Sequence, residues 1–211
     1  MSKFIIGYLD DDPGQRIEFY NLFKDRFDIK IIEMIEISSP LDIINILSQM
    51  SIELIVLDFM LNSQGSYFNA DKIVLEIKKW NPYFPMLILT SHEIDAFQDL
   101  DNVNIINRKE DLNKEKGNTN LFVLKIEKNI LNYRKFKNDA IEKLKELADK
   151  KLDTGLSISE EEEYYKLFRY LDDTSPSEKM LPSNFITPEK ISTLHDLLES
   201  ARDILKELKG E

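Results

Sequence analysis

The chain has 211 residues, and 42% of them are hydrophobic, which is enough for one substantial core and a smaller additional region. It contains no cysteine and only two histidines, which excludes disulfides and a cysteine nucleophile and makes a zinc site unexpected. The formal net charge of -11 disfavours binding to the phosphate backbone of nucleic acids.

No apolar stretch approaches the length of about 20 residues that a membrane-spanning helix needs. The N-terminal segment 1–7 is too short, and reaches acidic residues too soon, to be a secretory signal peptide. We therefore expect a cytoplasmic protein that does not enter a membrane.

The segment 53–61 joins a short apolar run to one carboxylate, that of Asp58. Such a run is typical of a strand buried on both faces, as in a parallel sheet. A carboxylate inside it is tolerable at the carboxyl end of the strand, where open α/β sheets have their ligand crevice. Taken alone, Asp58 is equally compatible with a cap of the following turn.

Strand and helix patterns alternate five times within about 120 residues, which predicts an α/β fold with a doubly wound parallel sheet. We expect the strand order 2-1-3-4-5. The predicted strands are 4–9, 29–37, the segment ending at Asp58, 85–89 and 103–106. The predicted helices are 13–24, a helix capped by Ser38-Ser39-Pro40 and ending at Met50, 71–80, and 93–100.

From residue 120 onward only helical patterns follow, so we predict an α/β domain at 1–135 and an all-α extension at 136–211. A fifth helix should run to about residue 150 along a seven-residue apolar repeat of Ile130, Tyr133, Ala140, Leu144 and Leu147. A capping box at Ser159 predicts a sixth helix that ends near residue 171. A linker at 172–186 precedes a last helix, from Thr187, with an apolar seam over 191–208.

Polar residues stand at four of the predicted strand ends: Asp10 with Asp11, then Asp58, Thr90 and Lys109. Because strands one and three are neighbours, their three carboxylates should meet in one crevice. Their repulsion requires a cation, and oxygen ligands suit Mg²⁺. A metal-bound Asp58 could attack a phosphoryl group, with Thr90 bonding a phosphoryl oxygen and Lys109 neutralising charge. Each residue alone also has a structural explanation, but their joint order favours the functional one.

The stretches 5–12, 54–61, 87–91 and 105–109 together resemble the receiver domains of two-component response regulators, which have a flavodoxin-like fold. The resemblance covers about residues 3–135. It implies that Asp58 accepts a phosphoryl group from a sensor histidine kinase or phosphotransfer protein. It also implies that Asp10, Asp11, Asp58 and the main-chain carbonyl of Met60 bind Mg²⁺, and that Thr90 and Lys109 respond to phosphorylation.

The sequence departs from this family at four places. Glu110 stands where proline usually follows the lysine, which leaves open whether Lys109 or Arg108 contacts the phosphoryl group. Ile106 replaces a frequent switch aromatic, so rotation of a Tyr or Phe cannot be the readout. The loop 62–69 is longer than usual and lacks a proline, and the fourth helix is short. We expect phosphorylation with an altered relay.

Two other interpretations remain at this stage. Asp10 and Asp12 also match the Asp-x-Asp pattern of haloacid-dehalogenase-like phosphatases, with Asp10 as nucleophile and Asp12 as acid/base. That interpretation needs a later strand with an acidic pair, and it leaves Asp58 without a role. The third interpretation is a pseudo-receiver that serves only as a binding module.

The C-terminal region lacks a basic recognition helix after a glycine-containing turn, so we do not expect it to bind DNA. We predict a helical region for homodimerisation or for binding a downstream protein. Enzymatic activity is expected only in the receiver's own phosphoryl transfer and dephosphorylation. The sequence identifies neither the cognate kinase nor the downstream target.

Overall fold

The computed structural model describes residues 3–61, 69–112 and 118–173. The predicted last helix lies outside these residues, as do nearly all of the loop 62–69 and of the linker 172–186. The chain divides into two compact units, Met1–Phe136 and Lys137–Glu211, which are described separately. Within the described residues, no helix combines the length and the apolar character that crossing a membrane requires.

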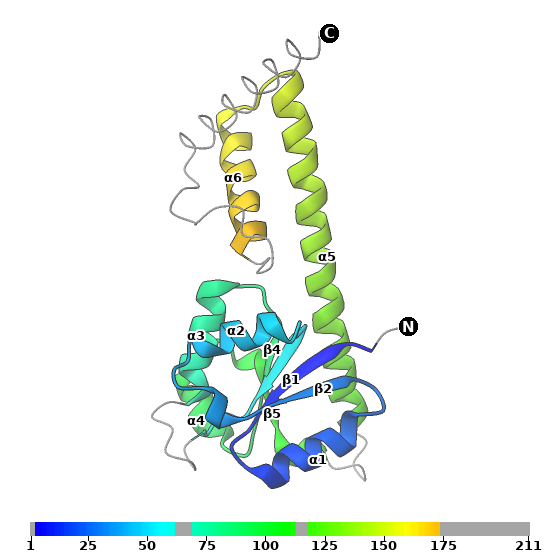
Figure 1. Cartoon of the computed structure of the whole chain (residues 1–211), viewed down its shortest axis with the longest axis vertical. Helices are drawn as coiled ribbons and strands as arrows, with labels where there is room; N and C mark the ends of the chain where they lie inside the picture. The colour runs from blue at the N-terminus through cyan, green and yellow to red at the C-terminus, as the bar shows by residue number, and fades with distance from the viewer. Residues whose placement is uncertain (1–2, 62–68, 113–117, 174–211) are drawn as a thin grey trace, which may run out of the picture. The chain divides into compact units, whose positions relative to one another are not determined.

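The first unit is built on a five-stranded sheet in which all paired strands are parallel (Figure 1). The strand order β2-β1-β3-β4-β5 is the predicted one, which confirms a doubly wound, flavodoxin-like sheet. The strands are β1 (Ile5–Leu9), β2 (Asp28–Ile32), β3 (Leu54–Leu57), β4 (Met86–Thr90) and β5 (Ile106–Arg108).

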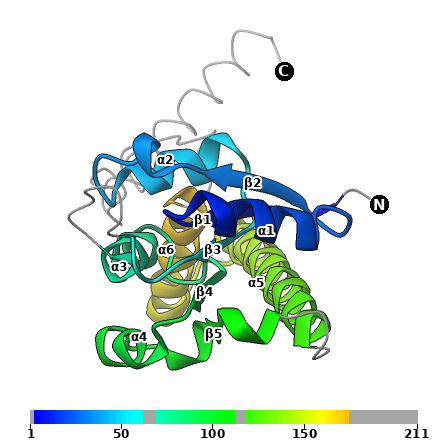
Figure 2. The same ribbon diagram turned by 90° about the horizontal axis from the view of Figure 1, so that it is seen from below.

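Helices cover both faces of this sheet, and Figure 2 shows α3 and α4 on one side with α1 and α5 on the other. Buried side chains form one apolar cluster on each face. Side chains of successive strand residues point to opposite faces, so residues 54 and 56 of β3 enter one cluster and 55 and 57 the other. The helices are α1 (Pro13–Phe23), α2 (Asp42–Gln49), α3 (Ala70–Trp80), α4 (Glu93–Asp99) and α5 (Asn118–Asp153).

Strand β2 ends five residues before its predicted end at residue 37, and a 3-10 turn, η1 (Met34–Glu36), follows it. The apolar composition of 29–37 is compatible with a longer strand, so pairing decides where the strand ends. Ile32 pairs with Leu9, the last residue of β1. Beyond Leu9 the neighbouring chain turns into an acidic loop and offers no strand to pair with.

The start of α2 is capped differently from the prediction. The serines do not supply the cap, because Oδ2 of Asp42 accepts the backbone N–H groups of Ser38 and Ser39 at 2.9 and 2.8 Å. The carboxylate of the first helical residue therefore satisfies the two N–H donors that precede the helix.

Strand β5 begins at Ile106, and the residues predicted to start it form a 3-10 turn, η2 (Val103–Ile105). The Oδ1 atom of Asn102 accepts the backbone N–H of Asn104 at 3.2 Å and so stabilises the turn. Local side-chain bonding therefore outweighs the strand preference of Val103 and Ile105. The predicted short α4 is confirmed, with seven residues.

In the second unit, the C-terminal part of α5 and α6 (Ile158–Asp173) form a helical hairpin. Gly155 occupies the connection with φ of +78°, a left-handed conformation that suits glycine. Lys150 Nζ lies 2.5 Å from Glu160 Oε1, and Lys151 Nζ lies 5.3 Å from the ring centres of Tyr164 and Tyr165. These contacts hold the end of α5 against the beginning of α6.

The capping box of α6 is formed by Ser157, and the prediction of Ser159 was wrong by two residues. The Oε2 atom of Glu160 accepts from the backbone N–H and the hydroxyl of Ser157 at 3.0 and 2.9 Å. Both serines have an acid three residues later, so the spacing alone could not distinguish them. The same contacts, above all the hydrogen bond from Lys150, hold the pKa of the Glu160 carboxyl down at about 2.

The apolar repeat of α5 serves more than one purpose. Ile130 is fully buried in the cluster on the α1 and α5 face, and Tyr133 packs against the cluster on the opposite face. Ala140 and Leu147 are also buried. The first part of the repeat is therefore core of the sheet domain rather than a surface open to a partner.

Asn81 connects the turn after α3 to α5. Its side chain is fully buried, its Nδ2 donates to the Tyr133 hydroxyl at 2.7 Å, and its Oδ1 accepts the backbone N–H of Tyr83 at 3.1 Å. A buried amide with bonds to two segments fixes the turn that leads into β4.

We expect Asn81→Ala to lower the free energy of unfolding by about 1–3 kcal/mol, because it removes both bonds from a buried site. Asn102→Ala is the matched control, since Asn102 makes the same side-chain bond two residues along the chain but on an exposed turn. Chemical denaturation measures both variants. Equal losses in the two would contradict the assigned role of Asn81.

Candidate functional site

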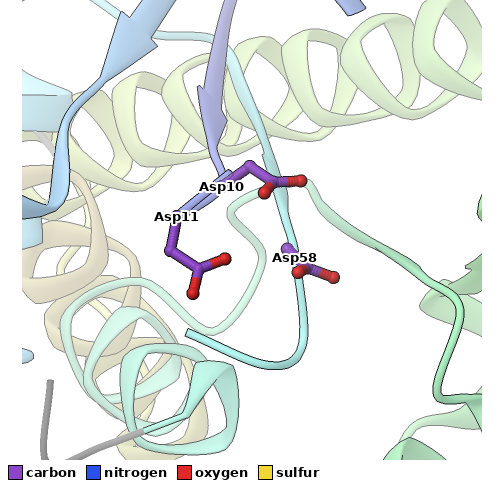
Figure 3. Close-up of side chains that lie close together, drawn as sticks. All are labelled: Asp10, Asp11 and Asp58. Carbon is purple, nitrogen blue, oxygen red and sulfur yellow. The ribbon is translucent and has the colours of Figure 1, made fainter. Parts of the chain in front are cut away.

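Three carboxylates meet at the carboxyl ends of β1 and β3. Asp10 and Asp11 follow β1, and Asp58 follows β3, which lies beside β1 in the sheet. All three residues are buried, and one carboxylate oxygen of each lies within 4.8 Å of the others (Figure 3). The backbone N–H of Asp58 donates to the Leu9 carbonyl at 2.8 Å, which ties the two strand ends together.

Lys109 is the cation that faces these carboxylates. Its Nζ lies 2.8 Å from Asp10 Oδ2 and 3.2 Å from Asp58 Oδ2. Arg108 points elsewhere, with its Nε 2.5 Å from Glu93 Oε1. The structure therefore places Lys109, rather than Arg108, against the acidic cluster.

Asp10 receives hydrogen bonds on both of its oxygens. Oδ2 accepts from the Tyr8 hydroxyl at 2.6 Å as well as from Lys109, and Oδ1 accepts the backbone N–H of Asp12 at 2.9 Å. Arg16 holds the same loop through Nη1, which donates to the carbonyls of Asp10 and Asp11 at 2.8 and 3.3 Å. Tyr8 and Arg16 are thus site residues that were not predicted from the sequence.

The pKa of Asp58 is shifted by its surroundings. Burial raises the pKa of Asp58 to about 6, with Lys109 opposing that shift and the Asp10 carboxylate adding to it. Its Oδ1 accepts the backbone N–H of Phe59 at 2.9 Å, which orients the group. Strong perturbation by burial and by specific charges is typical of functional carboxyls.

Lys109 stays charged and Tyr8 stays protonated beside these carboxylates. Burial opposes the charge on Lys109, but the hydrogen bond that Lys109 donates to Asp10 and the charge of Asp58 outweigh it, so the pKa of Lys109 is raised and the ammonium persists. Burial, together with the Asp10 charge, raises the pKa of Tyr8, which therefore remains a protonated donor.

The cluster opens into a cavity of about 470 Å³. Its lining comprises Asp10, Asp11, Asp12, Pro13, Gln15, Asp58, Met60, Ser91, His92 and Lys109. Thr90 is not part of this lining: it is fully buried at the end of β4, and its Oγ1 accepts the backbone N–H of His92 at 3.0 Å. The structure thus brings all predicted site residues except Thr90 to the cavity wall.

The donor set fits a small hard cation. The three carboxylates carry three negative charges if all are ionised, Lys109 contacts Asp10 and Asp58, and a divalent ion among the three would further relieve their repulsion. The three carboxylates offer oxygen ligands, and the cavity leaves room for water, as Mg²⁺ prefers. Asp10, Asp11 and Asp58 are therefore a possible site for this ion.

Asp12 has a different environment from the other acids. Its Oδ1 accepts the backbone N–H groups of Gly14 and Gln15 at 2.6 and 3.4 Å and so caps α1, which begins with Pro13 as predicted. An acid/base role for Asp12 would have to compete with this cap. Beyond Lys109, the described residues contain only helices, with no strand that could carry the acidic pair of a phosphatase.

No protein-family model matches the sequence, and no curated protein matches it. The chain is similar to solved receiver structures, among them the signal receiver domain of an HD domain-containing protein from Pseudomonas fluorescens Pf-5 (10% identity, TM-score 0.47, covering 63% of this chain and 98% of that one).

Two further similar structures are of RcsB from Salmonella enterica serovar Typhimurium. One is its isolated REC domain with the phosphomimetic BeF3- (15% identity, TM-score 0.40, 52% of this chain and 79% of that one). The other is RcsB bound to promoter rprA (16% identity, TM-score 0.43, 93% of each chain). The first two of these three structures are described as a signal receiver domain and a REC domain.

We expect Asp58→Asn to stabilise the protein without added metal by roughly 1–3 kcal/mol at pH 8. The native carboxyl, with its raised pKa, holds its proton more tightly than the unfolded chain does. The wild type therefore loses stability as pH rises from about 4 to 6, whereas asparagine cannot titrate.

Denaturant unfolding at several pH values measures this difference. The gap between variant and wild type should widen from pH 4 to 6 and then level off. Asp25→Asn, at an exposed position, is the control and should show no such gap. A gap that is absent at pH 8, or independent of pH, would refute the electrostatic account of Asp58.

Proposed function

We propose that residues 1–136 form a phosphoryl-accepting receiver domain and that the chain is a two-component response regulator. The observation that carries the proposal is the buried Asp58, which shares Lys109 with Asp10 at the switch point of the sheet and faces an open cavity. The phosphoryl donor would be a histidine of a sensor kinase or phosphotransfer protein.

The proposed reaction is a displacement at phosphorus. A carboxylate oxygen of Asp58 forms the new bond to phosphorus, while the bond from phosphorus to the donor nitrogen breaks and the imidazole leaves. Asp10, Asp11, Asp58 and the Met60 carbonyl would hold Mg²⁺. The bound ion would neutralise the carboxylates and draw charge from the phosphoryl oxygens.

Lys109 has a second task in this proposal. The ammonium now lies between Asp10 and Asp58, close enough to follow negative charge onto an Asp58 phosphoryl group. Thr90 would donate its hydroxyl proton to a phosphoryl oxygen, and because Thr90 is fully buried outside the cavity lining, its side chain would have to move toward the cavity. Movement of these two groups would convert phosphorylation into a change at the ends of β4 and β5.

The described geometry also offers a route toward α5. Asn107, in the middle of β5, donates from Nδ2 to the Ile88 carbonyl at 3.3 Å, and its Oδ1 accepts from Lys125 Nζ of α5 at 2.6 Å. Ile106, which stands where the family often has an aromatic, packs against the core. We infer that the polar link through Asn107 replaces an aromatic switch.

For the output we propose protein–protein interaction by the C-terminal helices, either with a second copy or with a downstream protein. The acidic chain supports this choice over DNA binding, although RcsB is described in complex with a promoter. A pseudo-receiver is the second candidate, which Ile106 and Glu110 favour. The phosphatase is disfavoured because Asp12 caps a helix and Asp58 would have no role.

Acetyl phosphate with Mg²⁺ should add one phosphoryl group to the protein, as intact mass measures. The label should be absent in Asp58→Asn, because the nucleophile is gone, and strongly reduced in Asp11→Asn, because a metal ligand is lost. Asp12→Asn should retain the label, since asparagine also caps helices.

Label that persists in Asp58→Asn would overturn the assignment of the phosphoacceptor, and label on Asp10 would favour the phosphatase. Failure of the wild type to take up label or to bind beryllofluoride would favour the pseudo-receiver.

Beryllofluoride with Mg²⁺ should change the self-association of the full chain, or its capture of a partner, and should not induce retention of duplex DNA. Light scattering gives the mass in each state, and gel shifts at physiological salt test DNA. If the protein is monomeric in every state, self-association is excluded as the output and binding of a downstream protein is left. Tight, salt-sensitive DNA retention would refute the proposed output.

A further inference from the structure

Tyr8 is a polar side chain inside an otherwise apolar strand. It is 1% exposed, lies two residues before Asp10 and therefore points to the same side of β1. Its hydroxyl reaches along the strand to Asp10 Oδ2 at 2.6 Å. The apolar cluster around Tyr8 requires its ring but not its hydroxyl.

The ring of Tyr8 has little freedom. It stacks on Phe19 of α1, with ring centres 3.9 Å apart and an angle of 12° between the planes. Phe19 in turn contacts Phe23, whose ring centre lies 5.8 Å from that of Phe122 in α5. An aromatic row across the core therefore fixes the position from which the hydroxyl donates.

Asp10 Oδ2 thus has two donors of different mobility. Lys109 Nζ, at 2.8 Å, sits at the end of a long side chain and also contacts Asp58. The Tyr8 hydroxyl, at 2.6 Å, is attached to a ring that the core holds. If Lys109 shifts toward a charge on Asp58, the Tyr8 bond continues to orient Oδ2.

We propose that Tyr8 is a positioning residue for Mg²⁺ binding, which acts by holding the Asp10 carboxylate in its ligating orientation. This inference rests on the proposed function, because it assigns Asp10 to the metal. Groups that orient a ligand commonly contribute a factor of about 10–100 to metal affinity. A hydroxyl that merely satisfies a buried strand would contribute to folding stability and leave metal affinity unchanged.

Tyr8→Phe tests the proposal because it deletes the hydroxyl and keeps the ring on Phe19. Calorimetric titration of the full chain with Mg²⁺ should give a dissociation constant about tenfold higher than that of the wild type. In acetyl phosphate labelling, the Mg²⁺ concentration for half-maximal rate should rise more than the saturating rate falls. Thermal melts without metal confirm that the variant folds.

Tyr133→Phe is the matched control. It removes a hydroxyl that accepts a hydrogen bond from Asn81 in the same unit, away from the carboxylates. It should lower the melting temperature and leave Mg²⁺ affinity at the wild-type value.

The possible results distinguish a failure of the role of Tyr8 from a failure of the proposed receiver function. Mg²⁺ binding by Tyr8→Phe that equals or exceeds that of the wild type overturns the role of Tyr8 and leaves the receiver proposal standing. A wild type that binds no Mg²⁺ overturns the proposed function itself. A half-maximal Mg²⁺ concentration that rises equally in Tyr8→Phe and Tyr133→Phe also overturns the role, because the loss is then general.

Discussion

The site depends on one electrostatic constraint, which is that three buried carboxylates lie together and two of them, Asp10 and Asp58, share the ammonium group of Lys109. Two carboxylates whose oxygens lie within 4.8 Å repel each other by on the order of 3–4 kcal/mol at an effective dielectric constant of about 20. Lys109 offsets this repulsion for Asp10 and Asp58 because it contacts both. Burial and the charge of Asp10 nevertheless raise the pKa of Asp58, and Lys109 offsets this shift only in part. The fold positions these four groups, and they would respond together to any added cation or phosphoryl group.

The fold of the first unit and the meeting of its three site carboxylates could be predicted from the sequence. In a parallel sheet, the strand order determines which strand-end side chains lie close together. Once β1 and β3 are neighbours, acids at their carboxyl ends must meet. Tyr8 could not be identified in this way, since a tyrosine fits the apolar alternation of a buried strand. Only the stacking on Phe19 shows where its hydroxyl points. Which of Lys109 and Arg108 faces the carboxylates could likewise not be predicted without the register of β4 and β5. In this register Arg108 is the last residue of β5 and pairs with Thr90.

The errors in element boundaries arise from neighbouring groups that the sequence pattern does not show. Residues 33–37 and 103–105 have strand-like composition, but a strand persists only where a neighbour offers free hydrogen-bonding groups. The partner of β2 ends at Leu9, and the side chain of Asn102 starts a turn before β5 can begin. The caps of α2 and α6 depend in the same way on which of several nearby polar side chains reaches the free N–H groups. Composition sets the kind of element, and neighbouring groups set its ends.

The link between β5 and α5 sets a limit on what the proposed relay can transmit by itself. The bond from Lys125 to Asn107 is the contact through which a shift at Lys109, two residues farther along, would reach α5. A hydrogen bond to a charged group contributes about 1.5–3 kcal/mol, so its loss changes an equilibrium by a factor of about 10–160. A ligand or modification shifts a conformational equilibrium only by its differential interaction with the two states. A larger response would need additional surface that is buried in one state only. Leu121 and Leu124, which are 56% and 59% exposed on α5 near this bond, are apolar groups that could supply it.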